Sequence, residues 1–324
     1  MRSMTDPFLI DPQVFDGPVL VTGAGGCIGA WTLGILAGSG VEAVAFDLAE
    51  DRRRPALVMG ESAARGLIWE TGDITDYAGF EQILKTNGIT AIIHLAGLQL
   101  PFCKANPPLG ARVNVEGTIN VLEAARTLGL KRLTYASSTA VHGIPPGGPV
   151  ITSLYGAYKV ANENTAQVYW HDWQVPSVGI RPNVVYGVGR DQGMTSKTTV
   201  ALAHAVQGAA FEIPYTGPVS WLHAGEAASA FIAAVSRDGD GAPVFDLNGG
   251  TETVEGALAL LSDLAPGHQV TCSGPVLPVP YDLDDGPLRA YLGDYPSVSP
   301  KAGITQTFNA FQALNSAGRL ARTG

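Results

Sequence analysis

The sequence VLVTGAGGCIGAW places Gly23, Gly26 and Gly29 at a spacing of three residues, after an apolar run and before a helical pattern. In a strand–turn–helix unit, one glycine permits the tight turn, one lets the backbone approach a pyrophosphate, and one lets helix and strand pack closely. Backbone N–H groups at the helix start then face the phosphate. A merely tight turn is the alternative, but the flanking strand and helix favour a dinucleotide-binding turn that includes Cys27 and Ile28.

Asp47 ends the next apolar run, VEAVAFD (41–47). A carboxylate at this place can hydrogen-bond the adenosine ribose hydroxyls and repel a 2′-phosphate, which favours NAD over NADP. Arg52, Arg53 and Arg54 follow closely and could neutralise a phosphate. A solvated basic turn is the simpler interpretation of the three arginines.

Strand-like and helical patterns alternate through the first half of the chain. We predict strands at 18–23, 41–47, 66–76, 90–97, 131–138 and 175–182, and helices at 27–40, 77–88, 111–129 and 155–173. Such alternation predicts a parallel sheet with helices on both faces, a Rossmann-type doubly wound α/β fold. The later pattern is looser, with helices expected at 198–208, 222–237 and 254–266, a strand and turn at 243–250, and an irregular segment at 275–282.

This pattern divides the chain into a cofactor domain and a smaller, discontinuous C-terminal substrate domain. Residues 1–17 would be an N-terminal extension, and residues 18–182, rejoined by about 222–250, an NAD-binding Rossmann domain. Residues of about 183–221 and 251–324 would form the substrate-binding domain.

The composition limits the classes of partner. With 324 residues, 46% of them hydrophobic and 15% charged, the chain can bury a large core. A net charge of −9 disfavours nucleic acid and anionic membranes as partners, and no apolar run reaches membrane length. Its three cysteines form no C-x-x-C pair, which disfavours a metal site or a disulfide framework and favours a cytoplasmic protein.

Several motifs occur in a fixed order along the chain. They are TGAGGCIG (22–29), GDITD (72–76), HLAG (94–97), NVEGTINVLEAAR (114–126), YASSTAVHG (135–143), YGAYK (155–159) and RPNVVYG (181–187). Together they resemble the extended short-chain dehydrogenases/reductases of the NAD-dependent epimerase/dehydratase family. DLNGG (246–250) and SPKAGITQTFNAF (299–311) resemble the second domain of that family.

The resemblance implies further cofactor contacts. Asp73 and Ile74 would flank the adenine, and Asn114 would support the fourth strand and its helix. The residues expected near the nicotinamide half are Leu95, Ala96 and Gly97. A lone histidine at a strand end, here His94, is more often a structural hydrogen-bonding group than a catalyst.

Tyr155 and Lys159 are four residues apart, so a helix would place them on one face, whereas Tyr158 would point about 100° away. A free tyrosine has a pKa near 10, and we expect the ammonium and the oxidised nicotinamide to lower it. Tyr155 could then exchange a proton with the substrate, while Lys159 also fits as a ligand of the nicotinamide ribose, as the family resemblance implies. The family pattern adds Ser138 as the third member, with Ser137 as the alternative, although Y-x-x-x-K pairs also arise by chance.

Departures from the family bear on the substrate. Thr139 and Ala140 stand where sugar-nucleotide dehydratases carry an acidic pair, which disfavours water elimination. The 142–154 loop is short and almost uncharged, and Val184 occupies the place of a diphosphate-binding asparagine, with Asn183 one position away. Only one arginine lies between residues 191 and 288, whereas a diphosphate attracts several cations. These features argue against a nucleotide-linked substrate.

The 188–199 loop resembles the polar loop of relatives that oxidise small hydroxy or amino acids. Arg190 could bind a carboxylate bidentately and Thr195 a hydroxyl, although a solvent loop that caps the next helix would look similar. The predicted substrate contacts are therefore Ser138, Thr139, Asn183, Arg190 and Thr195. Trp221 and His223 could belong to a lid, but packing is the simpler interpretation.

The sequence predicts an NAD-dependent oxidoreductase that transfers hydride to or from a small sugar, sugar acid or related hydroxy metabolite. An NAD-dependent epimerase that oxidises its sugar transiently is the alternative, and a non-catalytic dinucleotide sensor the third. We expect a homodimer, a small polar substrate and no bound metal.

Overall fold

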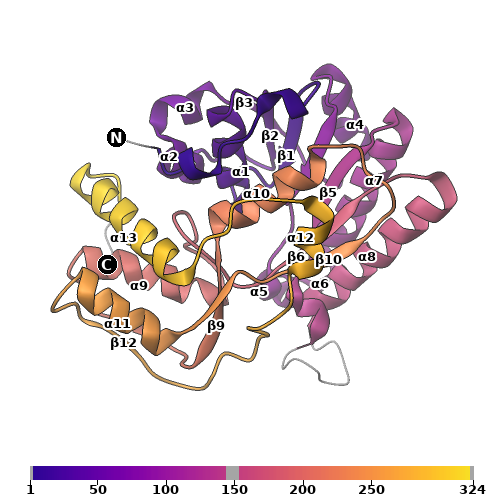
Figure 1. Ribbon diagram of the computed structural model, residues 1–324. Coiled ribbons are helices and arrows are strands. Elements are labelled where there is room, and N and C mark those ends of the chain that lie inside the picture. The colour runs from indigo at the N-terminus through magenta and orange to yellow at the C-terminus, as the bar shows by residue number, and fades with distance from the viewer. Residues whose placement is uncertain (1–2, 144–152, 322–324) are drawn as a thin grey trace.

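The computed structural model describes residues 3–143 and 153–321, so most of the 142–154 loop lies outside the described residues (Figure 1). Seven parallel strands form the main sheet in the order β10-β6-β5-β4-β1-β2-β3. Their bounds are β1 Val19–Thr22, β2 Ala43–Asp47, β3 Ile68–Thr71, β4 Ala91–His94, β5 Arg132–Ala136, β6 Val178–Pro182 and β10 Val244–Leu247. The order reverses at β1, which pairs with both β2 and β4, and this places a crevice at the carboxyl ends of those strands.

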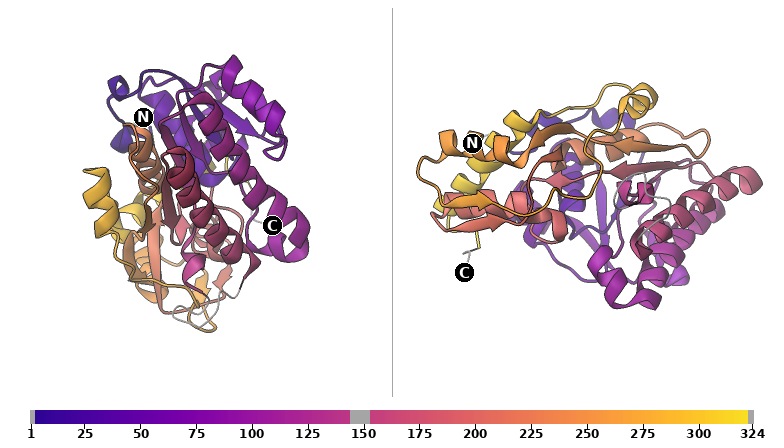
Figure 2. Two further views of the ribbon diagram at one scale, coloured as in Figure 1. Left: turned by 90° about the vertical axis from the view of Figure 1, so that its right-hand side faces the viewer. Right: turned by 90° about the horizontal axis from the view of Figure 1, so that it is seen from below.

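Helices cover both faces of this sheet (Figure 2). On one face lie α1 (Cys27–Gly38) and α10 (Ala224–Val235); on the other lie α4 (Tyr77–Thr86), α7 (Gly117–Leu128) and α8 (Leu154–Trp173). Alternate residues of β1 enter different cores: Val19 and Val21 pack toward α1, and Leu20 packs toward α4 and α7. The predicted doubly wound Rossmann-type fold is confirmed.

A second region contains the remaining strands and helices. It has a three-stranded sheet, β11-β9-β7, and a two-stranded sheet, β12-β8. The bounds are β7 Val185–Tyr186, β8 Phe211–Ile213, β9 Pro218–His223, β11 Gly250–Thr253, β12 Val270–Cys272, α9 Lys197–Val206, α11 Val254–Leu264, α12 Gly286–Leu292 and α13 Pro300–Ser316.

The chain returns to the main sheet after β9. Helix α10 packs against α1, and β10 pairs in parallel with β6, with Val244 opposite Gly179. At the N-terminus, Phe8 is buried beside Trp31 and stacks on His223. The division into domains stays a prediction, but these contacts bring distant parts of the chain to one sheet.

Several predicted elements need correction. The long helix α13 was not predicted, and neither were five short helices: α2 (Arg53–Met59), α3 (Glu61–Gly66), α5 (Leu100–Ala105), α6 (Pro107–Ala111) and α12. The five short helices are too short to show a helical period. The third strand ends at Thr71 rather than at 76: the Asp76 amide donates to the Asp73 carbonyl at 2.9 Å in a turn, and Asp76 then caps α4 by accepting a hydrogen bond from the Gly79 amide. Leu222 and His223, predicted as helical, end β9.

Within the described ranges, no helix is long and apolar enough to cross a membrane. No group of three or more histidine, cysteine, aspartate or glutamate side chains in those ranges is placed to hold a metal ion.

Candidate active site

A cavity of about 560 Å³ lies at the carboxyl ends of the central strands. It gathers nearly all of the predicted site residues from separate parts of the chain. They are Gly23, Gly26, Cys27, Ile28, Gly29, Asp47, Asp73, Ile74, Leu95, Ala96, Gly97, Ser138, Thr139, Tyr155, Lys159, Asn183, Arg190 and Thr195. Asn114 lies behind the cavity wall rather than in it.

The glycine turn fits closely against its own backbone. Gly23 has φ +69, and a Cβ there would lie 2.8 Å from the Ala96 amide nitrogen. A Cβ on Gly29 would overlap the Gly23 carbonyl oxygen, and one on Gly26 would lie 3.0 Å from the same atom. Because these neighbours are backbone atoms, they cannot move aside cheaply. The turn therefore keeps an open cradle at the start of α1, where N–H groups can face a diphosphate.

Asp47 lies at one end of the cradle, beside Gly25. Its Oδ2 accepts a hydrogen bond from the Gly25 amide at 2.9 Å, and its Oδ1 accepts one from the Leu48 amide at 2.8 Å. These bonds fix the carboxylate at the end of β2, beside the glycine turn. Further along the wall, Asp73 accepts a hydrogen bond from the Thr75 amide, and Asn120 holds the carbonyl of Ile74.

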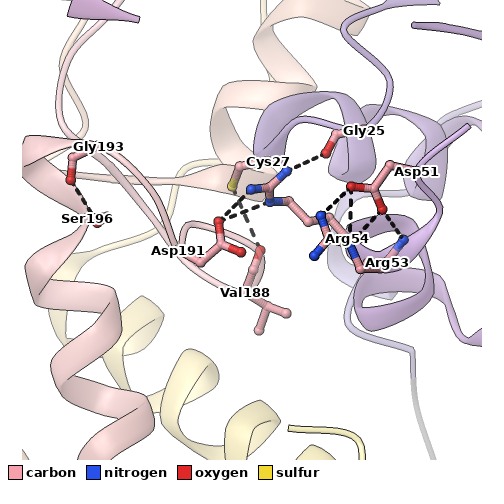
Figure 3. A network of polar contacts seen from close by, with 9 residues as sticks. All are labelled: Gly25, Cys27, Asp51, Arg53, Arg54, Val188, Asp191, Gly193 and Ser196. Atoms are coloured by element: carbon pink, nitrogen blue, oxygen red, sulfur yellow. Dashed lines mark hydrogen bonds and ion pairs between the residues drawn. The ribbon is translucent and has the colours of Figure 1, made fainter. Parts of the chain in front are cut away.

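Arg54 corrects the expectation of a solvated basic turn. Its Nη1 donates to the Gly25 carbonyl at 2.8 Å, and its Nη2 donates to Asp191 at 2.7 Å (Figure 3). Its side chain is only 15% exposed, whereas that of Arg53 is 82% exposed. Arg53 fits the solvated interpretation; Arg54 instead joins the glycine turn to the 188–199 loop.

The end of β4 is held by Thr22. Its hydroxyl accepts hydrogen bonds from the Leu95 and Ala96 amides, both at 3.1 Å, and lies 2.8 Å from Nδ1 of His94. Burial lowers the pKa of His94 to about 3, so the ring is neutral. The other ring nitrogen contacts the Thr118 hydroxyl at 3.2 Å. His94 is thus a structural hydrogen-bonding residue below the cofactor wall.

Asn114 lies in a π-helical turn, Arg112–Glu116, that precedes α7. Its Nδ2 donates to the carbonyls of Leu98 and Gly110 at 3.2 and 3.0 Å. A Cβ on Gly97 would lie 2.7 Å from Asn114 Oδ1, so a side chain at position 97 would displace the Asn114 amide group. Asn114 thereby supports the segment after β4 from behind.

Tyr155 and Lys159 lie on one face of α8, whose first turn is capped by Ser153. Lys159 Nζ is 5.6 Å from the centroid of the Tyr155 ring and donates to the Ala136 carbonyl at 2.6 Å. Burial lowers the pKa of Lys159 to about 8. Tyr158 points elsewhere and donates to the Pro107 carbonyl at 2.9 Å.

The expected lowering of the Tyr155 pKa is not found in the structure. Burial raises this pKa, while a hydrogen bond with Ser138 and the charge of Arg190 lower it to a smaller extent. The Lys159 ammonium donates its hydrogen bond to the Ala136 carbonyl and not to the Tyr155 hydroxyl. Tyr155 is therefore a protonated phenol at neutral pH.

The two adjacent serines have different partners. Ser138 lies near Tyr155, and its Oγ accepts a hydrogen bond from the Ala140 amide at 3.2 Å. Ser137 is buried and donates to Glu163 at 2.5 Å. Only Ser138 is thus available to a substrate oxygen beside Tyr155.

The other side of the cavity is built from side chains of several segments. Asn183 donates to Asn248 at 2.7 Å and to the Pro280 carbonyl at 2.9 Å, which leaves its amide group occupied. Arg190 donates through Nη2 to Thr195 at 3.2 Å, while its buried Nε has no hydrogen-bond partner. Wall residues not predicted from sequence include Leu98, Gln99, Leu100, Met194, Val279 and Pro280.

No local motif could have identified this second group. Gln99 is carried to the cavity by the short α5 segment, and Pro280 by an irregular segment far along the chain. Trp221 and His223 are buried away from the cavity, and Trp221 donates to the Glu252 carbonyl at 3.1 Å. Both are packing residues.

A parallel sheet with a glycine turn and a carboxylate after β2 defines a dinucleotide-binding Rossmann protein. Residues 19–247 match the NAD-dependent epimerase/dehydratase family, and the chain belongs to it. The open cradle beside the fixed Asp47 carboxylate suits NAD, which is the cofactor of the family.

Curated relatives resemble parts of the chain. A UDP-glucose 4-epimerase of Schizosaccharomyces pombe is 30% identical over 164 residues, covering 47% of this chain and 46% of that protein. The UDP-glucose 4-epimerase of Mus musculus is 36% identical over 135 residues, or 39% of each chain. The chain thus spans less than half the length of these relatives.

Solved structures match over almost the whole fold. A UDP-glucose 4-epimerase of Thermotoga maritima has a TM-score of 0.77 at 20% identity, covering 92% of this chain and 99% of the other. An L-threonine dehydrogenase of Cupriavidus necator has a TM-score of 0.76 at 21% identity, covering 91% and 99%. At this identity the likeness shows the fold, and both epimerases and dehydrogenases share it.

Proposed function

We propose that the protein is an NAD-dependent oxidoreductase acting on a hydroxyl-bearing carbon of a small sugar, sugar acid or related hydroxy metabolite. The observation that carries this proposal is the convergence of Ser138, Tyr155 and Lys159 on one cavity with the glycine turn. The three side chains come from β5's end and from α8, and each has a chemical use beside a nicotinamide.

Each member of the triad has a distinct role in this proposal. Ser138 orients the substrate oxygen, and the Tyr155 phenol exchanges a proton with that oxygen. NAD, when bound, accepts or returns the hydride, and its positive oxidised ring favours the Tyr155 phenolate needed for oxidation. Lys159 binds the nicotinamide ribose through its ammonium, which the Ala136 carbonyl already orients. Gly97, with Asn114 behind it, lets the cavity wall after β4 lie close to the nicotinamide half of the cofactor.

Arg190 is the proposed substrate anchor. It is one of the cations of the cavity wall, and its buried Nε lacks a partner. A carboxylate would satisfy that donor and accept a second bond from the same guanidinium. Thr195 and Thr139 supply hydroxyls nearby. Asn183 instead stabilises the cavity wall, because its amide group is bonded to Asn248 and to the Pro280 carbonyl.

An epimerase is the second candidate, because several relatives are UDP-glucose 4-epimerases. It would use the same triad and return the hydride within one turnover. The absence of an acidic residue at positions 139 and 140 speaks against elimination of water, but it does not separate oxidation from epimerisation. A non-catalytic dinucleotide sensor ranks third, because all three triad side chains are present.

We also propose a homodimer in the cytoplasm. Helices α7 and α8 present exposed apolar side chains, Ile119, Val168 and Trp173, which a second copy could cover. Free cysteines suit a reducing compartment.

The test is to incubate the purified protein with NAD and a panel of free sugars, aldonates and uronates, and to follow NADH absorbance. NADH formed in proportion to substrate supports net dehydrogenation. Isomerised product without NADH accumulation would put the epimerase first. NAD binding with neither product, across the panel and a set of nucleotide sugars, would favour the sensor.

A further inference from the structure

The 188–199 loop is attached to the glycine turn by a small group of polar contacts (Figure 3). Arg54 contributes most of them. Its Nε and Nη2 donate to one oxygen of Asp191 at 3.1 and 2.7 Å, and its Nη1 donates to the Gly25 carbonyl at 2.8 Å. One guanidinium therefore touches two segments that are far apart in the sequence.

Gly25 is held on both of its backbone groups. Its amide donates to Asp47 at the end of β2, and its carbonyl accepts from Arg54 in the connection that follows β2. This connection fixes the plane of the peptide that leads into Gly26 and Cys27. The orientation of that peptide sets the direction of the N–H groups that are expected to face the diphosphate.

The loop on the other side of Arg54 is also well anchored at its start. The Val188 carbonyl accepts a hydrogen bond from Trp31 Nε1 at 2.9 Å, and Trp31 is a buried residue of α1. Asp191 directly follows Arg190, the proposed substrate anchor. Its side chain is 60% exposed, so few contacts other than Arg54 restrain it.

The charges of this group act at the start of α1. Burial raises the pKa of the Cys27 thiol to about 11, and the charges of Arg190 and Arg54 oppose that rise, while Asp191 adds to it. Both guanidinium groups are thus close enough to affect the place where the diphosphate would bind.

We propose that Arg54 is a positioning residue that couples the phosphate-binding turn to the substrate loop. Through Gly25 it orients the turn, and through Asp191 it sets the position of Arg190. Binding of NAD at the turn then orders the 188–199 loop. Without the Arg54–Asp191 pair, NAD can still bind at the turn but no longer orders the loop. This inference rests on the proposed NAD-dependent function and adds the coupling between its two ligand sites.

Three variants test the coupling. Arg54→Gln removes both contacts, Asp191→Asn weakens only the loop contact, and Arg53→Gln is the matched control, since Arg53 pairs with Asp51 on the exposed side. NAD affinity is measured by calorimetry. Hydrogen–deuterium exchange with and without saturating NAD then follows peptides covering 23–29 and 187–196.

In the wild type and in Arg53→Gln, we expect NAD to slow exchange in both peptides. Arg54→Gln should bind NAD about tenfold more weakly, as expected for loss of a charged hydrogen bond, and lose the loop protection even at saturation. Asp191→Asn should keep NAD affinity within about twofold and turn protection, and lose loop protection. Because Asp191 is exposed, this variant tests the coupling even if Arg54→Gln unfolds.

Loop protection by NAD that persists in Asp191→Asn would overturn the inference. So would a wild type in which NAD protects the turn but not the loop, and that result would leave the proposed function intact. A wild type that does not bind NAD at all would overturn both.

Discussion

The two halves of the cavity are built differently. The cofactor half consists of backbone at strand ends, with glycines that no side chain could replace at Gly23 and Gly29. The substrate half consists of side chains that meet from α5, the end of β6, the 188–199 loop and the segment around Pro280. A short backbone motif is enough to bind a cofactor that many proteins share. Recognition of a particular substrate depends instead on side chains that only the fold brings together.

The largest effect is expected from Gly29→Ala in the cofactor half. Its new Cβ would overlap the Gly23 carbonyl, so the turn must distort, with a loss of about 1–3 kcal/mol in stability and loss of NAD binding. Thermal unfolding and NAD titration measure both. Gly66→Ala is the control, since nothing lies within 4 Å of its Cβ. If Gly29→Ala bound NAD like the wild type, backbone packing would not define this half.

Tyr155→Phe tests the reacting centre where the halves meet. Without the phenol, turnover should fall about 10²–10⁴-fold, while NAD affinity stays close to that of the wild type. Steady-state kinetics on a substrate found in the panel gives the first quantity and calorimetry the second. Tyr158→Phe should keep most activity, because Tyr158 bonds only the Pro107 carbonyl. Equal activity in the two variants would remove Tyr155 from the chemistry.

Arg190→Gln tests the substrate half alone. We expect KM for a carboxylated substrate to rise about tenfold or more, as a charge-assisted pair is lost, and KM for an uncharged analogue to change little. NAD affinity should change less than in Gly29→Ala. A uniform rise in KM for charged and uncharged substrates would mean that Arg190 shapes the loop without binding a carboxylate.

The smallest effect is a pH dependence that Lys159 imposes on both halves. Its pKa is lowered from 10.5 to about 8 by burial, so the ammonium is present below pH 8 and is lost above it. The value of kcat/KM for NAD should therefore fall as pH rises through about 8. Stability should change in the opposite sense: between about pH 8 and 10.5 the unfolded chain binds more protons, so folding becomes more favourable as pH rises.

Kinetics and chemical denaturation from about pH 7 to about pH 11 measure the two trends, with Lys159→Met as the reference that lacks the titrating group. Because kcat/KM reports groups of the free enzyme, an alkaline limb near the ordinary lysine value would show that burial does not lower the Lys159 pKa. A stability curve with the same slope in both proteins would assign the trend to other groups.

Much of the cofactor half was predictable. The spacing of Gly23, Gly26 and Gly29 reports a backbone constraint that operates within a few residues, and the four-residue step from Tyr155 to Lys159 reports a helix face. The burial that raises the Tyr155 pKa was not predicted, because sequence spacing gives proximity to a charge but not the degree of burial. Arg54 was assigned to solvent for a related reason: its partner Asp191 lies 137 positions away.

The sequence by itself thus determined the Rossmann-type sheet, the dinucleotide turn and the pairing of Tyr155 with Lys159, since each depends on local periodicity or spacing. The tertiary structure alone decided which serine faces Tyr155, where Arg54 points, and that Gln99 and Pro280 share a wall with Arg190. These outcomes depend on how strands and loops from distant positions pack, and no periodic pattern in the chain records such contacts.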